Sequence, residues 1–218
     1  MFESVGVIDL GTYLVGAIFI ILLPGPNSLF VLATAAAKGI RPGYLAAAGI
    51  FVGDTILIAL TAAGAGTLLQ TVPLLFYALR ALGAGYLGYL GIRILWSLLR
   101  PTPQQSNPAP EVLEQQVKHG NYFSKALVLS LLNPKAILFL LSFFVQFVDP
   151  AKGHPWLAFM VLGAFLQLFS MVYLSTLIFG GTRLANTFRK HRYLAIFSHA
   201  AVAILFIVFA VRMAFGVA

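Results

Sequence analysis

The feature that most constrains this chain is a proline-rich break inside a long apolar run. Residues 10–37 are mostly apolar, yet Pro24, Gly25 and Pro26 stand in the middle of them, followed by Asn27. A proline has no backbone N–H, so a regular helix cannot continue through this stretch. In hydrocarbon, each freed backbone group costs several kcal/mol unless protein or water satisfies it. The break therefore predicts a polar cavity, with a kink packed by a neighbouring helix as the alternative.

Composition decides which environment surrounds this break. Of the 218 residues, 60% are hydrophobic and only 9% are charged, which is far from the composition of soluble globular domains. The chain has no cysteine, which excludes disulfides, thiolate metal sites and thiol nucleophiles. About 20 apolar residues cross a bilayer as a helix. Six runs reach that length: 10–37, 43–69, 73–99, 123–148, 155–180 and 194–217. We therefore expect an all-α membrane protein with six transmembrane helices in a single transmembrane domain, residues 1–218.

The basic residues are not spread evenly over the loops between these runs. The net charge of +8 comes mainly from the first, third and fifth loops, whereas the second has no charge and the fourth has Lys152 as its only basic residue. The basic residues in or beside the odd-numbered loops are Lys38, Arg41, Arg100, Lys118, Lys125, Arg183, Arg189, Lys190 and Arg192. Positive loops stay on the cytoplasmic side, so both termini are expected outside. This distribution favours membrane anchoring over nucleic-acid binding.

A polar linker divides the chain into two halves. Residues 100–122 are rich in proline and glutamine, as in a flexible linker. They separate a first repeat, 10–99, from a second repeat, 123–217. Each half has three spans, which is an odd number, so the two repeats should be inverted relative to each other in the membrane.

A second break stands at the corresponding place in the second half. Asn133, Pro134 and Lys135 interrupt the fourth run, so the first and fourth helices are both expected to be broken. Asparagine followed by proline is a favoured start of a helix. We therefore expect half-helices that begin at Asn27 and at Asn133 and approach each other from opposite sides. Helix starts carry free N–H groups and a positive dipole end, so two of them facing one cavity predict a carboxylate site.

One acidic residue lies near the middle of the second run. Asp54 follows Gly49 and Gly53, a small-xxx-small pattern that permits close helix packing. A charge at the bilayer centre costs at least about 2.5–3.5 kcal/mol, so its presence suggests a function. We interpret Asp54 as the proton-coupling residue, and a permanent structural salt bridge is the alternative.

Two further polar side chains lie at similar depth. Lys135 could hold a substrate carboxylate, pair with Asp54 or alternate between the two, whereas its central position makes snorkelling harder. Gln167 lies in the fifth run as the pseudo-symmetric counterpart of Asp54. Its amide could hydrogen-bond to a substrate, or it could join neighbouring helices.

The pattern Gly83-Ala84-Gly85-Tyr86-Leu87-Gly88 matches GxGxxG but does not predict a dinucleotide site. It lies inside an apolar run with no preceding strand, so we interpret it, together with Gly91, as a surface for tight helix packing. No Walker A or HExxH motif is present, and the sequence predicts no cofactor and no metal.

Taken in order, these motifs resemble those of a known family. The segments are Leu23-Pro24-Gly25-Pro26-Asn27, Gly49-x-x-x-Gly53-Asp54, Gly83 to Gly91, Asn133-Pro134-Lys135-Ala136 and Phe143-Phe144-Val145-Gln146-Phe147. Together they resemble the lysine exporter superfamily, in its homoserine/threonine exporter branch. The resemblance implies a proton-driven exporter of small amino acids in the bacterial inner membrane. Within that branch, Thr12 to Ile20 and Ser142 to Phe147 are most similar to leucine exporters, which carry an acidic residue near the position of Gln167.

The sequence therefore predicts a secondary exporter of leucine and similar neutral amino acids, and not an enzyme. Its partners are the amino acid, a proton and membrane lipid; a homodimer is left open. The predicted substrate-binding residues are Pro24, Gly25, Pro26, Asn27, Asn133, Pro134, Lys135 and Gln167, with Asp54 as the proton carrier. Export of threonine or homoserine, or a passive amino-acid channel, are the alternatives.

Overall fold

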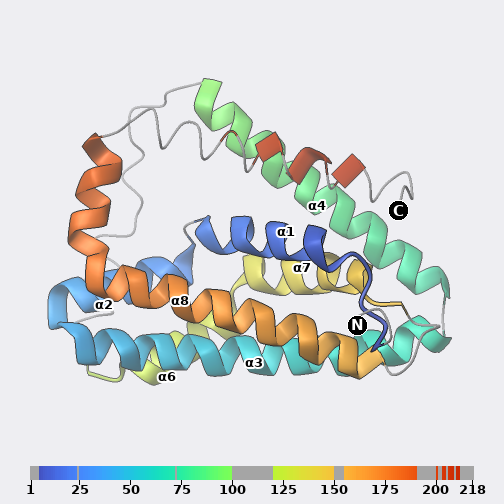
Figure 1. The fold of residues 1–218 in the computed structure, drawn as a ribbon, viewed down its shortest axis with the longest axis horizontal. Coiled ribbons are helices and arrows are strands. Elements are labelled where there is room, and N and C mark those ends of the chain that lie inside the picture. The colour runs from blue at the N-terminus through green and yellow to red at the C-terminus, as the bar shows by residue number, and fades with distance from the viewer. Residues whose placement is uncertain are drawn as a thin grey trace.

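The computed structural model describes residues 5–23, 25–71, 73–99, 120–149, 155–190, 200, 203–204, 206–208 and 210–211. Over this part of the chain the protein is all-helical, apart from an isolated antiparallel bridge between Val7 and Val148. Its elements are α1 (Leu10–Leu22), α2 (Pro26–Lys38), α3 (Ile40–Thr71), α4 (Pro73–Leu99), α6 (Tyr122–Leu131), α7 (Pro134–Ser142), the 3₁₀ helix η2 (Phe144–Phe147) and α8 (Pro155–Lys190). Figure 1 shows α3 and α8 running along each other.

Both predicted helix breaks are present. Helix α1 ends at Leu22 and α2 begins at Pro26, with a bend of 51° between them. Helix α6 ends at Leu131 and α7 begins at Pro134, with a bend of 47°. The expected start at Asn27 is wrong by one residue. Pro26 takes the first helical position because its fixed φ suits that position and its missing N–H would have no acceptor there.

The apolar helices agree with a multi-pass membrane protein. Residues Ile40–Gly64 of α3 and Pro155–Gly180 of α8 are each long and apolar enough to cross a bilayer, and each bent pair could supply one more span. The described residues thus hold two to four candidate spans, and six spans as an inverted repeat stay a prediction. The linker, up to residue 119, and most of 194–217 lie outside these residues. The candidate span Pro155–Gly180 agrees with the predicted fifth span, and helix α8 continues beyond it to Lys190.

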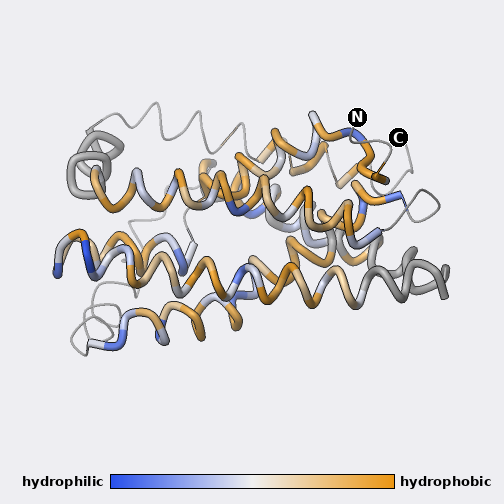
Figure 2. The backbone as a smooth tube through the Cα atoms, turned by 60° about the horizontal axis from the view of Figure 1, so that its bottom comes forward, coloured by the Kyte–Doolittle hydropathy of each residue, from blue (hydrophilic) through white to orange (hydrophobic). Residues whose placement is uncertain are grey.

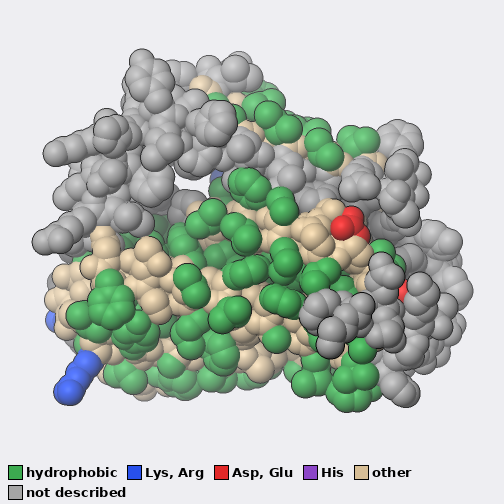
Figure 3. Space-filling model, viewed as in Figure 1, with side chains coloured by type: hydrophobic (Ala, Val, Ile, Leu, Met, Phe, Trp, Pro, Cys, Tyr) green, Lys and Arg blue, Asp and Glu red, His purple; other side chains and the backbone are tan. Residues whose placement is uncertain are grey.

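The surface fits the same environment. Figure 2 shows hydrophobic residues along most of the length of the helices, and hydrophilic ones largely near their ends. In Figure 3 hydrophobic side chains cover much of the visible face, and few charged side chains are seen on it. Such a surface suits contact with lipid chains, which need no polar partner.

Helix α3 packs most closely against α6, through the two glycines that precede Asp54. A Cβ atom at Gly49 would lie only 2.2 Å from the Phe123 carbonyl oxygen, and one at Gly53 would lie 2.7 Å from the Ser130 Cβ. Only glycine permits this approach, so the predicted small-xxx-small packing is confirmed. The contact fixes the helix that carries Asp54 beside the helix that ends at the second break.

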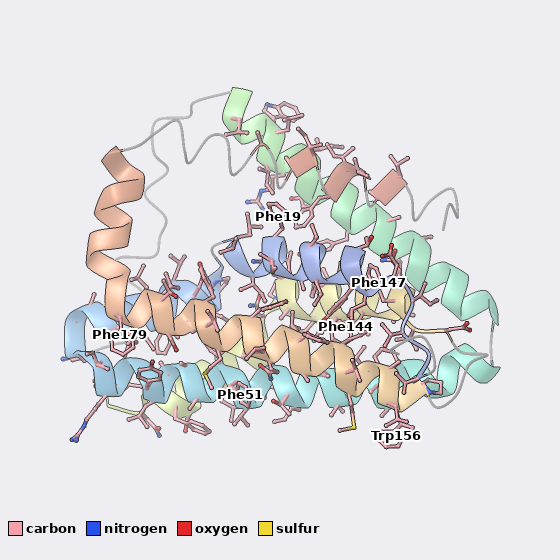
Figure 4. The ribbon with its side chains drawn as sticks, in the orientation of Figure 1. Phe19, Phe51, Phe144, Phe147, Trp156 and Phe179 are labelled. Atoms are coloured by element: carbon pink, nitrogen blue, oxygen red, sulfur yellow. The ribbon has the colours of Figure 1, made fainter. Side chains whose placement is uncertain are left out.

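An aromatic cluster joins α1 to η2 and α8. Tyr13 is fully buried, and its hydroxyl donates a 2.7 Å hydrogen bond to the Leu162 carbonyl of α8. Its ring centroid lies 5.6 Å from that of Phe144 and 5.4 Å from that of Phe147, both in edge-on contact. Figure 4 shows these two phenylalanines beside α1. The cluster holds the half-helix that ends at the first break.

The glycine-rich stretch of α4 is a helix-packing surface at its C-terminal end. A Cβ at Gly91 would lie 2.8 Å from Ile207 Cγ1 and 2.9 Å from the Ala203 carbonyl oxygen, both near the C-terminus. At Gly85 a Cβ would meet no described atom within 4 Å. The GxGxxG pattern lies wholly within α4, which agrees with packing and not with a dinucleotide loop.

Candidate transport site

The two helix breaks and Asp54 meet at one cavity of about 100 Å³. A cavity needs about 10–15 Å³ of volume open to a water-sized sphere to hold one water. This cavity is therefore large enough for several waters or a small solute. The lining residues are Ile20, Ile21, Leu23, Gly25, Asn27, Ser28, Ile50, Asp54, Asn133, Lys135, Ala136, Phe139, Leu140, Leu166, Ser170, Tyr173 and Leu174. They come from α1, α2, α3, α7 and α8 and from both breaks. Five predicted site residues thus face one space: Gly25, Asn27, Asp54, Asn133 and Lys135.

The first break is capped by a serine. Gly25 is the N-cap of α2, and its backbone N–H donates to Ser28 Oγ at 3.0 Å. Ser28 Oγ also lies 3.0 Å from the Gly25 carbonyl oxygen, to which it donates. Tyr173, on α8, lines the same cavity as Ser28. The two hydrogen bonds of Ser28 fix the start of α2.

The second break is capped by an asparagine. Asn133 is the N-cap of α7 and is only 5% exposed. Its side-chain oxygen accepts a 3.1 Å hydrogen bond from the Lys135 backbone N–H, and its carbonyl accepts from the Ile137 N–H at 3.0 Å. Asparagine and proline at these two positions form the favoured helix start that the sequence predicts.

Lys135 joins the two breaks directly. Its ammonium donates to the Ile20 carbonyl oxygen at 2.9 Å and to the Leu23 carbonyl oxygen at 2.5 Å. In an unbroken helix the Ile20 carbonyl would accept from the residue at position 24, but that residue is a proline and has no N–H. The side chain from the second break thus satisfies carbonyl groups that the first break leaves free.

Asp54 faces the same cavity from α3. Its carboxylate accepts a 2.5 Å hydrogen bond from Ser130 Oγ, on α6. Within the described residues Asp54 and Lys135 form no ion pair, because each is held by other partners. The cavity therefore presents a carboxylate and an ammonium group that have not neutralised each other by contact.

Asn27 contributes an acceptor that has no partner. Its side-chain oxygen is buried and makes no hydrogen bond in the structure, although the residue lines the cavity. A buried amide oxygen without a donor is uncommon in folded proteins and calls for a ligand or a water. It lies at the start of α2, on the side of the cavity formed by the first break.

The rest of the cavity lining is mainly aliphatic and aromatic. Its buried apolar residues are Ile20, Ile50, Phe139, Leu140, Leu166 and Leu174. The Phe139 ring stacks on Phe143, with centroids 4.8 Å apart, and this contact holds the ring in place. The cavity is therefore polar and charged at the breaks and apolar elsewhere, which matches a zwitterion with a hydrocarbon side chain.

The comparisons with known proteins agree with this geometry. The LysE type translocator family matches residues 18–216. The leucine efflux proteins of Salmonella typhimurium and Klebsiella pneumoniae are 45% and 44% identical to this chain. Each alignment covers 214 residues, which is 98% of both chains. An uncharacterised membrane protein of Pseudomonas aeruginosa is 50% identical over 215 residues, 97% of both chains. The chain belongs to the LysE type translocator family. No solved structure matches it.

In this LysE type translocator, three of the remaining predicted site residues are not among those that line the cavity. Gln167 is 9% exposed and donates through Nε2 to the Phe51 carbonyl at 3.0 Å and to Thr55 Oγ1 at 2.7 Å, so it joins α8 to α3. Its Oε1 is buried without a partner. Pro26 and Pro134 begin α2 and α7 and do not line the cavity. Pro24 lies outside the described residues.

Four polar residues at the translocator site were not predicted from the sequence: Ser28, Ser130, Ser170 and Tyr173. Ser28 is the third residue of α2 and accepts from the Gly25 N–H, but Gly25 has no side chain, so the sequence shows no capping box there. Ser130 and Tyr173 are single polar residues within apolar runs, and their positions alone do not predict a site. Only the packing of α6 and α8 against the cavity shows their roles.

Proposed function

We propose that this translocator exports leucine and similar neutral amino acids from the cytoplasm across the bacterial inner membrane, in exchange for protons. The observation that carries the proposal is a single cavity lined by Asp54, Lys135 and both helix starts together with aliphatic side chains. The names of the leucine efflux proteins, similar over almost the whole chain, support the choice of substrate.

The carboxylate of the amino acid would bind at the helix starts. The first N–H groups of α2 and α7 have no acceptor within their own helices, and the positive dipole end favours an anion. A lysine ammonium has three N–H donors, and Lys135 uses two of them on the carbonyls of Ile20 and Leu23. The third is free for the substrate carboxylate, beside the start of α7.

The ammonium of the amino acid would bind on the acidic side of the cavity. Asp54 offers a carboxylate that is oriented by Ser130, and Asn27 offers an amide oxygen that has no other donor. The apolar wall then receives the side chain, and burial of its CH₂ groups contributes about 0.8 kcal/mol each. Leucine and comparable aliphatic side chains gain most from such a wall, and threonine or homoserine gain less.

Asp54 is also the group that would carry the proton. It is the only carboxylic acid among the residues that line the cavity. A protonated Asp54 would release the substrate ammonium, and an ionised Asp54 would bind it, so proton entry and amino-acid release are alternatives at one site. Moving one charge through 100 mV releases about 2.3 kcal/mol. A tenfold solute gradient needs about 1.4 kcal/mol, so one proton is sufficient.

Exposed basic residues support an orientation of the chain in the membrane. Lys38 and Arg41 are exposed where α2 meets α3, which supports a cytoplasmic position for that end and an external one for the termini. A homodimer stays a prediction, which light scattering of the purified protein in detergent would test.

Flux measurements in proteoliposomes test the proposal. Vesicles filled with radiolabelled leucine should lose it faster when the outside is made more acidic than the inside. Unlabelled isoleucine, valine or methionine on the inside should compete strongly, and lysine or glutamate should not. Leucine flux that ignores the pH gradient would show a passive channel, and stronger competition by threonine or homoserine would change the substrate.

A further inference from the structure

The C-terminal end of α1 gathers backbone carbonyl groups without helical donors. In a continuous helix, the Ile20 and Leu22 carbonyls would accept hydrogen bonds from the N–H groups of residues 24 and 26. Both of these residues are prolines and have no N–H. The last carbonyls of any helix also carry the negative end of its dipole. In a membrane protein such an end must be satisfied from elsewhere, because unpaired carbonyls in hydrocarbon cost several kcal/mol each.

The group that satisfies this end is a cation. The Lys135 ammonium lies 2.9 Å from the Ile20 carbonyl oxygen and 2.5 Å from the Leu23 carbonyl oxygen. It does not pair with Asp54, which is held by Ser130. The positive charge therefore sits on neutral backbone oxygens at a helix end, the arrangement by which broken membrane helices coordinate monovalent ions.

We propose that the C-terminal end of α1 is a monovalent-cation site that the protein fills with its own lysine ammonium. Lys135 acts as a tethered cation, carried by α7 and bound to α1. Because the tether keeps the site occupied, the protein needs neither Na⁺ nor K⁺ to hold its two breaks together. Removal of the side chain would leave the carbonyls beside an existing cavity, where a cation from solution can take its place.

This inference is independent of the amino acid that is exported. It shares Lys135 with the proposed function, but its test measures cation-dependent stability in the absence of any amino acid. If the variant's stability depends on cations but the parent protein does not export leucine, only the proposed function is refuted. The reverse result, leucine export with no cation dependence in the variant, would refute the cation site alone.

The experiment compares Lys135→Ala with the parent protein in detergent. Melting temperatures are measured in sodium, potassium, ammonium and methylammonium chloride, and in choline chloride at the same ionic strength, because choline is too large for the site. The parent should melt at one temperature in all five salts. The variant should melt about 2–4 °C higher in at least one small cation than in choline, with saturation as its concentration rises. Equal melting temperatures of the variant in all five salts would overturn the proposal.

A second variant covers the case in which Lys135→Ala does not fold. The chain has no cysteine, so Lys135→Cys offers a single thiol. Attachment of an aminoethyl group through a disulfide restores an ammonium, and an uncharged propyl group of the same length does not. The aminoethyl form should melt near the parent and the propyl form well below it, whereas equal melting of the two forms would contradict the tethered cation. Lys38→Ala, at an exposed lysine, serves as the matched control and should show no salt preference.

Discussion

The two helix breaks are similar in sequence, but they leave opposite groups free. At the first break, prolines remove N–H donors, and the end of α1 is left with carbonyl oxygens. At the second break, Asn133 caps α7, and the next turn supplies the ammonium of Lys135. That ammonium binds the carbonyls of the first break. One break is therefore an acceptor and the other a donor.

This difference shows that two related breaks need not be equivalent walls of a site. The expectation from sequence was two matching positive helix starts that face one anion. The structure adds a negative helix end, which lies between them and is bound by Lys135. The polar side of the cavity therefore contains positive helix starts, a bound ammonium and the carboxylate of Asp54, which together suit a zwitterion better than a simple anion.

The largest expected effect on stability comes from the close packing of α3 against α6 and α2. A Cβ at Gly49 would lie 2.2 Å from a backbone oxygen of α6, whereas one at Gly43 would lie 2.9 Å from the Ala35 methyl group of α2. Neither contact can be relieved without a shift of backbone, because an alanine methyl group is fixed to its Cα, but the overlap at Gly49 is larger. Gly49→Ala should therefore lower the free energy of unfolding by about 3 kcal/mol, and Gly43→Ala by about 1 kcal/mol. Denaturation of the purified protein in detergent measures both.

Gly64 provides the control for this pair, because a Cβ there would meet no described atom within 4 Å. Gly64→Ala should leave stability unchanged or raise it slightly. If Gly49→Ala loses no more stability than Gly43→Ala, then α3 does not pack more tightly against α6 than against α2.

A smaller effect is expected from the cap of the second break. Asn133→Ala removes the acceptor of the Lys135 N–H, so it should cost about 1–2 kcal/mol of stability and lower leucine flux as Lys135 loses its position. Asn133→Ser retains a capping oxygen and should restore most of both. If the alanine and serine variants behave alike, the cap does not position Lys135.

The smallest effect is expected at the far end of α1. Tyr13→Phe removes the hydrogen bond to the Leu162 carbonyl but keeps the ring in the aromatic cluster. The loss should be about 1 kcal/mol of stability, with leucine flux nearly unchanged, because the cluster supports α1 without lining the cavity. Tyr89→Phe, at an exposed tyrosine of α4, is the matched control and should cost less. A large loss of flux in Tyr13→Phe would bring this tyrosine into the transport cycle.

Much of the local structure could be predicted from the sequence, because proline and glycine act locally. Missing N–H groups at positions 24, 26 and 134 locate both breaks, and the spacing of Gly49 and Gly53 indicates the close packing of α3. The start of α2 was predicted one residue late. The predicted fifth span, residues 155–180, agrees with the apolar part of α8, which continues as a helix to Lys190.

The partners of the site residues could not be predicted, because they depend on which helices meet. Lys135 contacts Ile20 and Leu23, which precede it in the sequence by 115 and 112 positions. Asp54 and Ser130 are 76 positions apart. Sequence placed Lys135 and Asp54 at similar depth and left a salt bridge between them open. Packing of α6 and α1 decides that each has another partner. The same packing directs Gln167 toward Phe51 and Thr55 and away from the cavity wall.

The central claim is that Asp54 couples protons to amino-acid export through the cavity between the breaks. The most direct test is the initial rate of leucine efflux from proteoliposomes, with and without an acidic exterior, for the parent and for Asp54→Asn. We expect an acidic exterior to accelerate leucine efflux by the parent. Asp54→Asn should lose this acceleration, and its efflux rate should be at least about tenfold lower than that of the parent. Efflux by Asp54→Asn at the parent rate, with the same response to the pH gradient, would contradict the central claim.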